Sequence, residues 1–563
     1  MCALGYATPN LGDAGATGLI SAHGVNVAFM AEGYRRTRDP KLAIAAYHAN
    51  GDKAEGLGRD IYSADPDALS KKIEAIAKPS GPFVVKSDLM TGYGMAMLQS
   101  GTKDNGIAVP VTFGHTSHHA HPDTLGLDVL AFNNWLLPDH GYPEYGTTWP
   151  SRDEWTDNTI SHNTVVVDEQ KQKEIWSGRT KLFKTLPGLS VVTLDGRNAY
   201  PQTKQYERTV LLVDAPDDNH YVVDLFRVEG GTDHVYSIHG PPGETTVTGL
   251  NLVEQQGGSY AGPDVAPEAH MEGTRMGYSY LFNVKRDNAP PGEFVVDWKA
   301  QPGYRNVKEG DDIHVRYHAL TQVNDVALAN GKPPQTKGGN PKTLPYLLLH
   351  RKGNDLGSTF VSVIEPYKTA PIIKSVARPV LGDKPVSLRV ELADGTTDLF
   401  IIQDTDQPDR ISMMRMQAGK ITSAIVINGS SFPTPDVKIQ STPAYTGKVL
   451  KMNRDLAGGG WMIVDAKLPE SVVGEHIMID SNTDRNPCYK IEKAEKIEGG
   501  TRIDCGPISF VQKYLGPTIT IRSQVVPKDY TGGFSYDFEE GDTFRIPMHA
   551  VWSAEKDATD ARR

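Results

Sequence analysis

Cysteine and long apolar runs are scarce in this chain of 563 residues, and acidic residues outnumber basic ones. Its three cysteines are too few for a cysteine-based metal framework, and a disulfide between Cys488 and Cys505 stays open. No apolar stretch approaches the roughly 18 residues of a membrane helix, and the N-terminus lacks the pattern of a signal peptide. The net charge of −11 disfavours a nucleic-acid role. We therefore expect neither a membrane nor a nucleic-acid partner.

Glycine and proline are abundant instead, with 55 and 38 residues. From about residue 82 onward, short segments rich in β-branched residues alternate with Gly, Asn, Asp and Pro. This pattern is typical of antiparallel strands joined by turns, and a β-sandwich is their natural closure. Because the chain is too long for one hydrophobic core, we expect more than one domain.

The first 78 residues have a helical pattern. Apolar residues recur at helical spacing over residues 14–34, with Asp13 as the candidate N-cap, and Asp39-Pro40 opens a second helix. A third helix is expected over residues 65–77, before a proline ends it. The predicted domains are a helical segment at 1–78, an antiparallel β-sandwich at 79–433 and a small C-terminal β-sandwich-like domain at 434–563.

Histidines gather between residues 113 and 168. Six of the chain's 17 lie there, namely His115, His118, His119, His121, His140 and His162. Histidine is the commonest metal ligand and the side chain most easily poised as an acid or base near neutral pH. A histidine-rich surface loop is the simpler alternative.

The spacing of these residues predicts a metal site. His119 and His121 are two apart on a segment that Pro122 keeps from being helical, so their side chains point to one side. A hairpin would return Asp139 to His121, and His162 stands directly before another strand. Converging His, Asp and His side chains form an N/N/O site that fits Zn²⁺. The alternative to a metal site is that these residues have structural roles, for example as core histidines bonded to backbone carbonyls.

The order and flanks of these residues resemble the heparinase II/III-like superfamily of polysaccharide lyases. The resemblance covers residues 1–430 approximately and is strongest over 113–168. The matching residues are His119, His121, Asp123, Leu136, Leu137, Asp139, Gly141, Tyr145, Arg152, His162, Asn163, Thr164, Val165, Val166, Val167 and Asp168. The resemblance implies an (α/α) toroid followed by an antiparallel β-sandwich. The expected fold is thus mainly β, with an N-terminal α remnant that ends an incomplete toroid.

By this resemblance, His121, Asp139 and His162 would bind zinc, and His119 would face the substrate cleft. The implied reaction is β-elimination at a uronic acid, in which the C5 proton is removed, the C4–O bond breaks and the carboxylate charge is stabilised. His119 is the first candidate for the catalytic residue and Tyr145 the second, unless Tyr145 is a packed strand-end tyrosine.

Arg152, Trp149 and Asn163 are the candidate substrate-binding residues. The implied partner is an acidic polysaccharide. The resemblance also implies a location outside the cell or in the periplasm. A homodimer is possible from the sequence. An excess of basic residues between Lys171 and Arg208 is either a landing site for a polyanion or a solvated face.

The chain departs from the family in one respect. The toroid normally supplies an Asn or His and a catalytic Tyr, and no counterpart is visible before the sandwich. We expect a fragment of a longer protein, a loss of activity, or residues supplied by another subunit. Two other functions therefore stay open: a non-catalytic carbohydrate-binding or scaffold domain with a structural metal, and a zinc hydrolase with Asp123 as its base.

Overall fold

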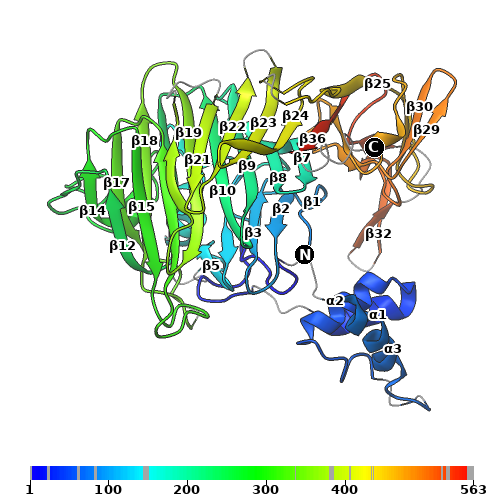
Figure 1. Ribbon diagram of the computed structural model, residues 1–563, viewed down its shortest axis with the longest axis horizontal. Helices are drawn as coiled ribbons and strands as arrows, with labels where there is room; N and C mark the ends of the chain where they lie inside the picture. The colour runs from blue at the N-terminus through cyan, green and yellow to red at the C-terminus, as the bar shows by residue number, and fades with distance from the viewer. Residues whose placement is uncertain are drawn as a thin grey trace.

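The structure is a computed structural model that describes most of the chain. The described residues are 3–21, 26–59, 62, 64–81, 85–143, 151–335, 338–379, 386–404, 407–432, 434, 437–521, 524–527 and 533–554. Antiparallel sheets dominate and helices are few, so the predicted mainly β class is confirmed (Figure 1). Among the described helices, none has the length and apolar character needed to cross a membrane.

Two large antiparallel sheets form the sandwich. The first has the order β12-β15-β16-β19-β10-β9-β8-β7 and the second β13-β14-β17-β18-β11-β6. The strands of the first are β7 (Arg179–Leu186), β8 (Leu189–Asp195), β9 (Gln205–Ala215), β10 (Asn219–Glu229), β12 (Gly243–Thr248), β15 (Glu293–Ala300), β16 (Ile313–Leu320) and β19 (Gly357–Lys368). Those of the second are β6 (Val165–Val167), β11 (Asp233–His239), β13 (Val253–Glu254), β14 (Leu281–Asp287), β17 (Asp325–Gly331) and β18 (Leu344–Lys352).

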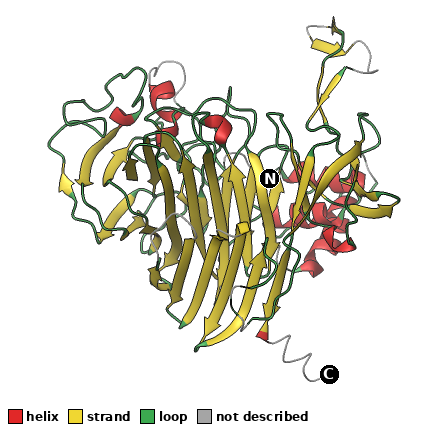
Figure 2. Ribbon diagram, turned by 90° about the horizontal axis from the view of Figure 1, so that it is seen from above, coloured by secondary structure: helices red, strands yellow, loops and turns green. Residues whose placement is uncertain are grey.

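A third sheet covers the outer face of the first, so that three layers are stacked (Figure 2). Its order is β20-β21-β22-β23-β24-β36. Its strands are β20 (Ile373–Ala377), β21 (Val386–Leu392), β22 (Thr396–Asp404), β23 (Gln407–Gln417), β24 (Lys420–Ile427) and β36 (His549–Ser553).

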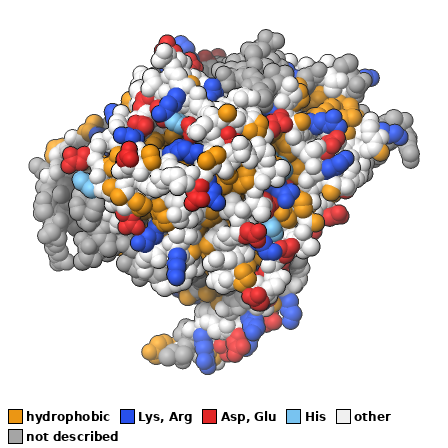
Figure 3. All heavy atoms as spheres, turned by 90° about the vertical axis from the view of Figure 1, so that its left-hand side faces the viewer, with side chains coloured by type: hydrophobic (Ala, Val, Ile, Leu, Met, Phe, Trp, Pro, Cys, Tyr) orange, Lys and Arg blue, Asp and Glu red, His pale blue; other side chains and the backbone are white. Residues whose placement is uncertain are grey.

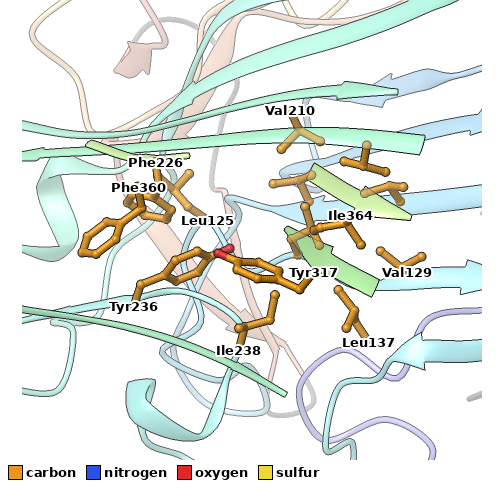
Figure 4. Close-up of a cluster of buried hydrophobic side chains, with 14 of the residues drawn as sticks. Leu125, Val129, Leu137, Val210, Phe226, Tyr236, Ile238, Tyr317, Phe360 and Ile364 are labelled. Atoms are coloured by element: carbon orange, nitrogen blue, oxygen red, sulfur yellow. The ribbon is translucent and has the colours of Figure 1, made fainter. Parts of the chain in front are cut away.

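Strand β10 shows how the sequence builds two cores at once. Val222 and Phe226 point into the core shared with the second sheet, whereas Val223 and Leu225 point toward the third sheet. Side chains alternate between the faces of a strand, so a strand buried on both faces needs a continuous apolar run. Figure 4 shows the first of these cores, where Phe226 lies among aromatic and aliphatic side chains.

A smaller sheet, β1-β2-β3-β4-β5, carries the histidine-rich stretch at its end. Its strands are β1 (Asp88–Met90), β2 (Met95–Ser100), β3 (Ile107–Thr112), β4 (Val129–Ala131) and β5 (Asn134–Leu137). Residues 3–21 pack against this sheet, with Ala3, Leu4 and Ala7 in one cluster with Met95 and Trp135.

The helix predicted over residues 14–34 is therefore wrong over residues 14–21. Helix α1 (Val27–Thr37) begins with Asn26 as its N-cap, and Asp13 caps nothing. The reason is tertiary, because Ala16 forms a β-bridge with Gly141 instead of a helical turn. Helices α2 (Pro40–Ala49) and α3 (Ala68–Ala77) confirm the other two predictions, with the Asp39 side chain accepting a hydrogen bond from the Lys41 N–H at 2.9 Å.

The helices share a small core of their own. Their buried side chains include Ala31, Tyr34, Ala46 and Ile73. They lie together at the blue end of the chain, apart from the stacked sheets (Figure 1). Their assignment to the end of a toroid stays a prediction. The short helical turns elsewhere are η1 (Lys78–Ser80), η2 (Arg152–Thr156, a π-helical turn), η3 (Thr159–Ser161), η4 (Arg197–Ala199), η5 (Tyr278–Tyr280) and η6 (Glu470–Val472).

The C-terminal strands form a module with a separate core. Its main sheet has the order β28-β27-β35-β25-β26-β30-β29, and two hairpins extend from it. The strands are β25 (Ala444–Met452), β26 (Trp461–Val464), β27 (His476–Asp480), β28 (Cys488–Lys490), β29 (Lys493–Ile497), β30 (Gly500–Asp504), β31 (Val511–Tyr514), β32 (Thr518–Ile521), β33 (Gln524–Pro527), β34 (Phe534–Tyr536) and β35 (Thr543–Pro547).

The boundary predicted at residue 434 does not separate all the strands. The last strand, β36, leaves the C-terminal module and pairs with β24 of the third sheet. Sequence pattern cannot show this, because an edge strand and a core strand of this length look alike. Cys488 and Cys505 are both buried free thiols.

Candidate metal centre and its cleft

The three predicted ligands meet at the ends of strands from different sheets. Asp139 follows β5, His162 lies between η3 and β6, and His121 comes from the connection between β3 and β4. One ligand atom from each lies within 4.8 Å of the others, and all three residues are buried. The spacing argument from the sequence is thus correct about where the chain brings them.

Hydrogen bonds fix the ring of His162. Its Nε2 is 3.0 Å from the carbonyl oxygen of Thr156, and its Nδ1 is 3.0 Å from Oδ2 of Asp139. A carbonyl only accepts, so Nε2 carries a proton. In the neutral ring Nδ1 is then a lone pair that faces a carboxylate, and two acceptors at this distance need a proton or a cation between them.

His121 supplies the second nitrogen. Its Nε2 is 3.4 Å from Oδ1 of Asp13 and 3.2 Å from Oδ1 of Asp157. Its Nδ1 is buried and has no hydrogen-bond partner among the described residues. A buried nitrogen without a partner is costly, and a metal ion would satisfy it. Two imidazoles and one carboxylate match the ligands that zinc takes, so these residues fit a zinc ion.

The charges of the centre are strongly coupled. Burial would raise the pKa of Asp139, but the charge and hydrogen bond of His162 lower it to about 2. Burial likewise opposes the charge on His162, yet Asp139 raises the pKa of this histidine. Asp139 is therefore held as a carboxylate, the form that a metal requires.

A second group of side chains lies above this centre and reaches solvent. Asp13 is its hub: Oδ2 is 2.8 Å from Nδ1 of His119 and accepts a hydrogen bond from Nη2 of Arg152 at 2.9 Å. Burial opposes the charge of Asp13, but hydrogen bonds from His121, His119 and Arg152 hold its pKa well below the ordinary range. The side chain of Asp13 is 3% exposed, whereas that of His119 is 86% exposed.

Gly12 explains how a residue so far upstream arrives here. Its φ of +56° is in the left-handed region, and a Cβ at this position would be 2.4 Å from the carbonyl oxygen of His119. This close approach lets the Asp13 N–H donate to the same carbonyl at 2.7 Å. The sequence reasoning missed Asp13 in this role, although the flanking glycine was a signal for a special backbone position.

The remaining predicted site residues have different fates. Arg152 lies at the rim, where its Nε also donates to Oδ2 of Asp157 at 3.2 Å. Asn163 is buried, its side chain donates to the Leu127 carbonyl at 3.0 Å and accepts from the His239 N–H at 2.9 Å. The predicted substrate-binding role of Asn163 is therefore wrong, because its amide is used inside the sandwich. Tyr145 and Trp149 lie outside the described residues.

A cleft of about 660 Å³ opens beside Arg152. Its walls include His118, Lys171 and His270, with Glu154 at its base. Glu154 is 3% exposed and bonded to His270 and to the hydroxyl of Tyr280. The cleft has the size and mixed polarity of a ligand site.

Asp123 does not occupy the position that a hydrolase base would need. It is 8% exposed and lies 3.3 Å from the Thr112 hydroxyl, and burial raises its pKa. It belongs neither to the His121–Asp139–His162 group nor to a second group of close ligand atoms formed by Asp13, His121 and Asp157. It also does not line the cleft. The geometry therefore disfavours the zinc hydrolase alternative.

The basic stretch from Lys171 to Arg208 is not a free cationic surface. Six of its eight basic residues form ion pairs: Arg179–Asp480, Lys181–Glu207, Lys184–Glu475, Arg197–Asp195, Lys204–Glu229 and Arg208–Asp224. Lys171 is the basic residue of this stretch that lines the cleft. On another face, at the β14 end of the molecule, Figure 3 shows acidic and basic side chains interspersed. The prediction of a polyanion landing site along the whole stretch is not supported.

The fold and the site together describe an antiparallel sandwich domain with a candidate metal site. The buried His121, Asp139 and His162 form this site, and the exposed His119 lies next to it. Residues 107–277, which contain this centre, match the family model described as heparinase II/III-like, C-terminal. This part of the chain is therefore similar to the C-terminal domain of heparinase II/III-like proteins, the superfamily that its motifs indicate.

Solved structures of two such proteins are similar to the chain. One is described as a heparinase III gene product, with 14% identity and a TM-score of 0.44 over 71% of this chain and 50% of that chain. The other is heparan sulfate lyase HepC from Pedobacter heparinus, with 16% identity and a TM-score of 0.41 over 71% of this chain and 50% of that chain. The chain thus spans about half the length of these structures. No curated protein matches it.

Proposed function

We propose that this chain provides the sandwich side of a polysaccharide lyase that cleaves an acidic, uronate-containing glycan by β-elimination. The observation that carries the proposal is the His119–Asp13–Arg152 cluster, in which Arg152 also lines the cleft. It combines an exposed imidazole, a carboxylate that orients it and a guanidinium in one place.

His119 is the candidate base. Its Nδ1 is bonded to Asp13, and this leaves the opposite nitrogen for the C5 proton of a uronate. A carboxylate behind an imidazole fixes the ring and stabilises the imidazolium that forms. The electron pair from the C5–H bond becomes the C4=C5 double bond as the C4–O bond breaks. Tyr145 stays the second predicted participant, as the acid that returns a proton to the leaving oxygen.

Arg152 is the candidate partner of the uronate carboxylate. Its Nε and Nη2 are bonded to Asp157 and Asp13, which holds the guanidinium plane at the rim. Among the described residues its Nη1 makes no hydrogen bond, so this edge is available to a ligand. Pairing with a cation withdraws charge from the carboxylate and makes the C5 proton more acidic.

His121, Asp139 and His162 would hold a zinc ion. All three are buried, so a bound ion would fix the strand ends and place a positive charge below the rim. The burial of the ligands favours this supporting role over activation of a water molecule. The same burial is the observation that favours the second candidate function, a non-catalytic glycan-binding domain with a structural metal.

The test is incubation of the chain with heparan sulfate, alginate and other uronate polysaccharides. A lyase gives unsaturated products, whose C4=C5 bond conjugated with the carboxylate adds ultraviolet absorbance. Glycan binding without any such product would replace the lyase proposal with the binding-domain function. Localisation outside the cell or in the periplasm is part of the same proposal and follows from the substrate.

A further inference from the structure

A second cleft, of about 420 Å³, lies where the sandwich meets the C-terminal module. The sandwich side contributes Tyr93, His115 and Trp176, and the module contributes Arg485 and Tyr489. The two sides are joined by hydrogen bonds, for example from the Thr180 N–H to Oδ1 of Asn486 at 2.8 Å. The cleft is therefore built by parts of the chain that are held together.

Aromatic rings with exposed surface line this cleft. Trp176 is 46% exposed and Tyr93 is 57% exposed, although large aromatic side chains usually bury most of their surface. The His115 ring packs on Trp176 with centroids 4.6 Å apart, and the Arg485 guanidinium lies 3.4 Å from the Trp176 ring centre. A pyranose ring presents a face of C–H groups that packs well on such rings.

The Nε group of Arg485 is buried and lacks a hydrogen-bond partner among the described residues. Oδ1 of Asp484 is 3.6 Å from this nitrogen, which is beyond hydrogen-bond distance. The side chain of Arg485 is 17% exposed, so a sugar hydroxyl or carboxylate in the cleft can pair with the exposed part of its guanidinium. Partly exposed aromatic side chains next to an arginine are what a sugar-binding subsite needs.

The cleft adjoins the candidate active site along a single loop. His115 lines this cleft, and its ring centre is 6.4 Å from that of His118, which lines the cleft beside Arg152. The two cavities thus lie on either side of residues 114–120. His115 and His118 are not ligands of the candidate metal centre.

We propose that this second cleft is an accessory subsite that binds a sugar unit of the same glycan on Trp176, Tyr93 and Arg485. The identity of the glycan rests on the proposed lyase function, but sugar binding at the cleft does not. The C-terminal module would then increase the affinity for long chains by adding contacts remote from the reacting unit.

The test compares Trp176→Ala and Arg485→Ala with the unchanged chain. We expect the affinity for heparan sulfate polymer or for an alginate oligosaccharide, whichever binds, to fall about 10-fold by calorimetry. If the chain is active, KM rises by a similar factor and kcat stays the same. Trp461→Ala is the matched control, because Arg502 lies 4.3 Å from the Trp461 ring centre in the same module but outside the cleft. It should leave affinity unchanged.

The outcomes separate this inference from the proposed function. Loss of binding in Trp176→Ala without any unsaturated product from the parent chain supports the subsite and rejects the lyase. Unchanged affinity and KM in both cleft variants, with product formed normally, overturns the subsite and leaves the lyase. An equal loss in Trp461→Ala, or an absence of binding to every glycan, also overturns the subsite. Thermal unfolding of each variant checks that the fold is retained.

Discussion

His119 and His121 are two residues apart, yet their surroundings are opposite. The side chain of His121 is 1% exposed and that of His119 is 86% exposed, and both reach the carboxylate of Asp13. The buried centre consists of His121, Asp139 and His162. The rim consists of the exposed His119, Arg152 and the buried carboxylate of Asp13 that joins them. In a buried centre each polar atom must find a partner, whereas rim groups can exchange theirs for a substrate. The comparison separates the buried centre, which we propose binds a metal ion, from the rim, which we propose acts on the substrate.

The largest expected effect breaks the buried centre. His162→Ala leaves the Asp139 carboxylate buried without its partner, and removal of one member of a buried charged pair costs about 3–5 kcal/mol. We expect loss of bound zinc by mass spectrometry and a fall of this size in the unfolding free energy. The control His118→Ala changes an exposed histidine of the same stretch, and its effect should stay within about 0.5 kcal/mol.

The next effect breaks the rim without touching the centre. Asp13→Asn keeps the shape of the side chain but removes the charge that orients His119, so turnover should fall about 10²- to 10⁴-fold. Zinc content should stay at the level of the unchanged protein. Asp153→Asn, which alters a carboxylate of the cleft beside Arg152, serves as the control. A rate for Asp13→Asn equal to that of the control would remove Asp13 from the proposed machinery.

A smaller effect tests how the two parts are joined. Gly12→Ala places a Cβ 2.4 Å from the His119 carbonyl oxygen at a positive φ. Gly188→Ala has a φ of +78° with open space around it, so it isolates the cost of the backbone angle, about 1–2 kcal/mol. The Gly12 variant should lose more stability than the Gly188 variant and should also lose turnover. Equal losses of stability, with turnover retained, would show that the close approach is unimportant.

The sequence predicted the two parts unequally. The centre was predictable because its residues lie within one stretch, where β spacing and strand ends decide what meets. Asp13 is 106 residues from His119, and helical periodicity around residue 14 competed with the true backbone. Asn163 was predicted to bind the substrate, whereas its amide is bonded inside the sandwich. Sequence adjacency shows which residues are near, but not which way each one faces.

The fold was predictable to a similar extent. The run of β-branched segments gave the mainly β class, and Asp39-Pro40 marked a helix start correctly. The return of β36 to the third sheet, some 120 residues after β24, is a long-range pairing without a local signal.

A last expected effect concerns a histidine outside both parts. His350 has Asp325 at 2.8 Å from Nδ1 and Asp233 at 2.9 Å from Nε2. Burial opposes its charge, but these hydrogen bonds raise the pKa of His350 to about 9. Because an unfolded histidine titrates near 6.5, this pair stabilises the fold fully below that pH and is lost as the pH rises through about 9.

Unfolding measured between pH 6 and pH 10 should therefore show a loss of stability in the unchanged chain. His350→Gln should flatten this part of the profile, since the amide does not titrate. A variant with the same slope as the parent would rule out His350 as the group responsible. A flattened profile would sharpen the comparison with the buried centre. Both ring nitrogens of His350 are paired with carboxylates, so this histidine needs no metal.

The central claim is that the centre holds a metal and the rim acts on the substrate. The most direct measurement is zinc content and unsaturated-product formation in His119→Ala and His121→Ala, side by side. We expect His119→Ala to keep its zinc and lose product formation, and His121→Ala to lose zinc together with thermal stability. Equal zinc content and equal stability in the two variants would contradict the account.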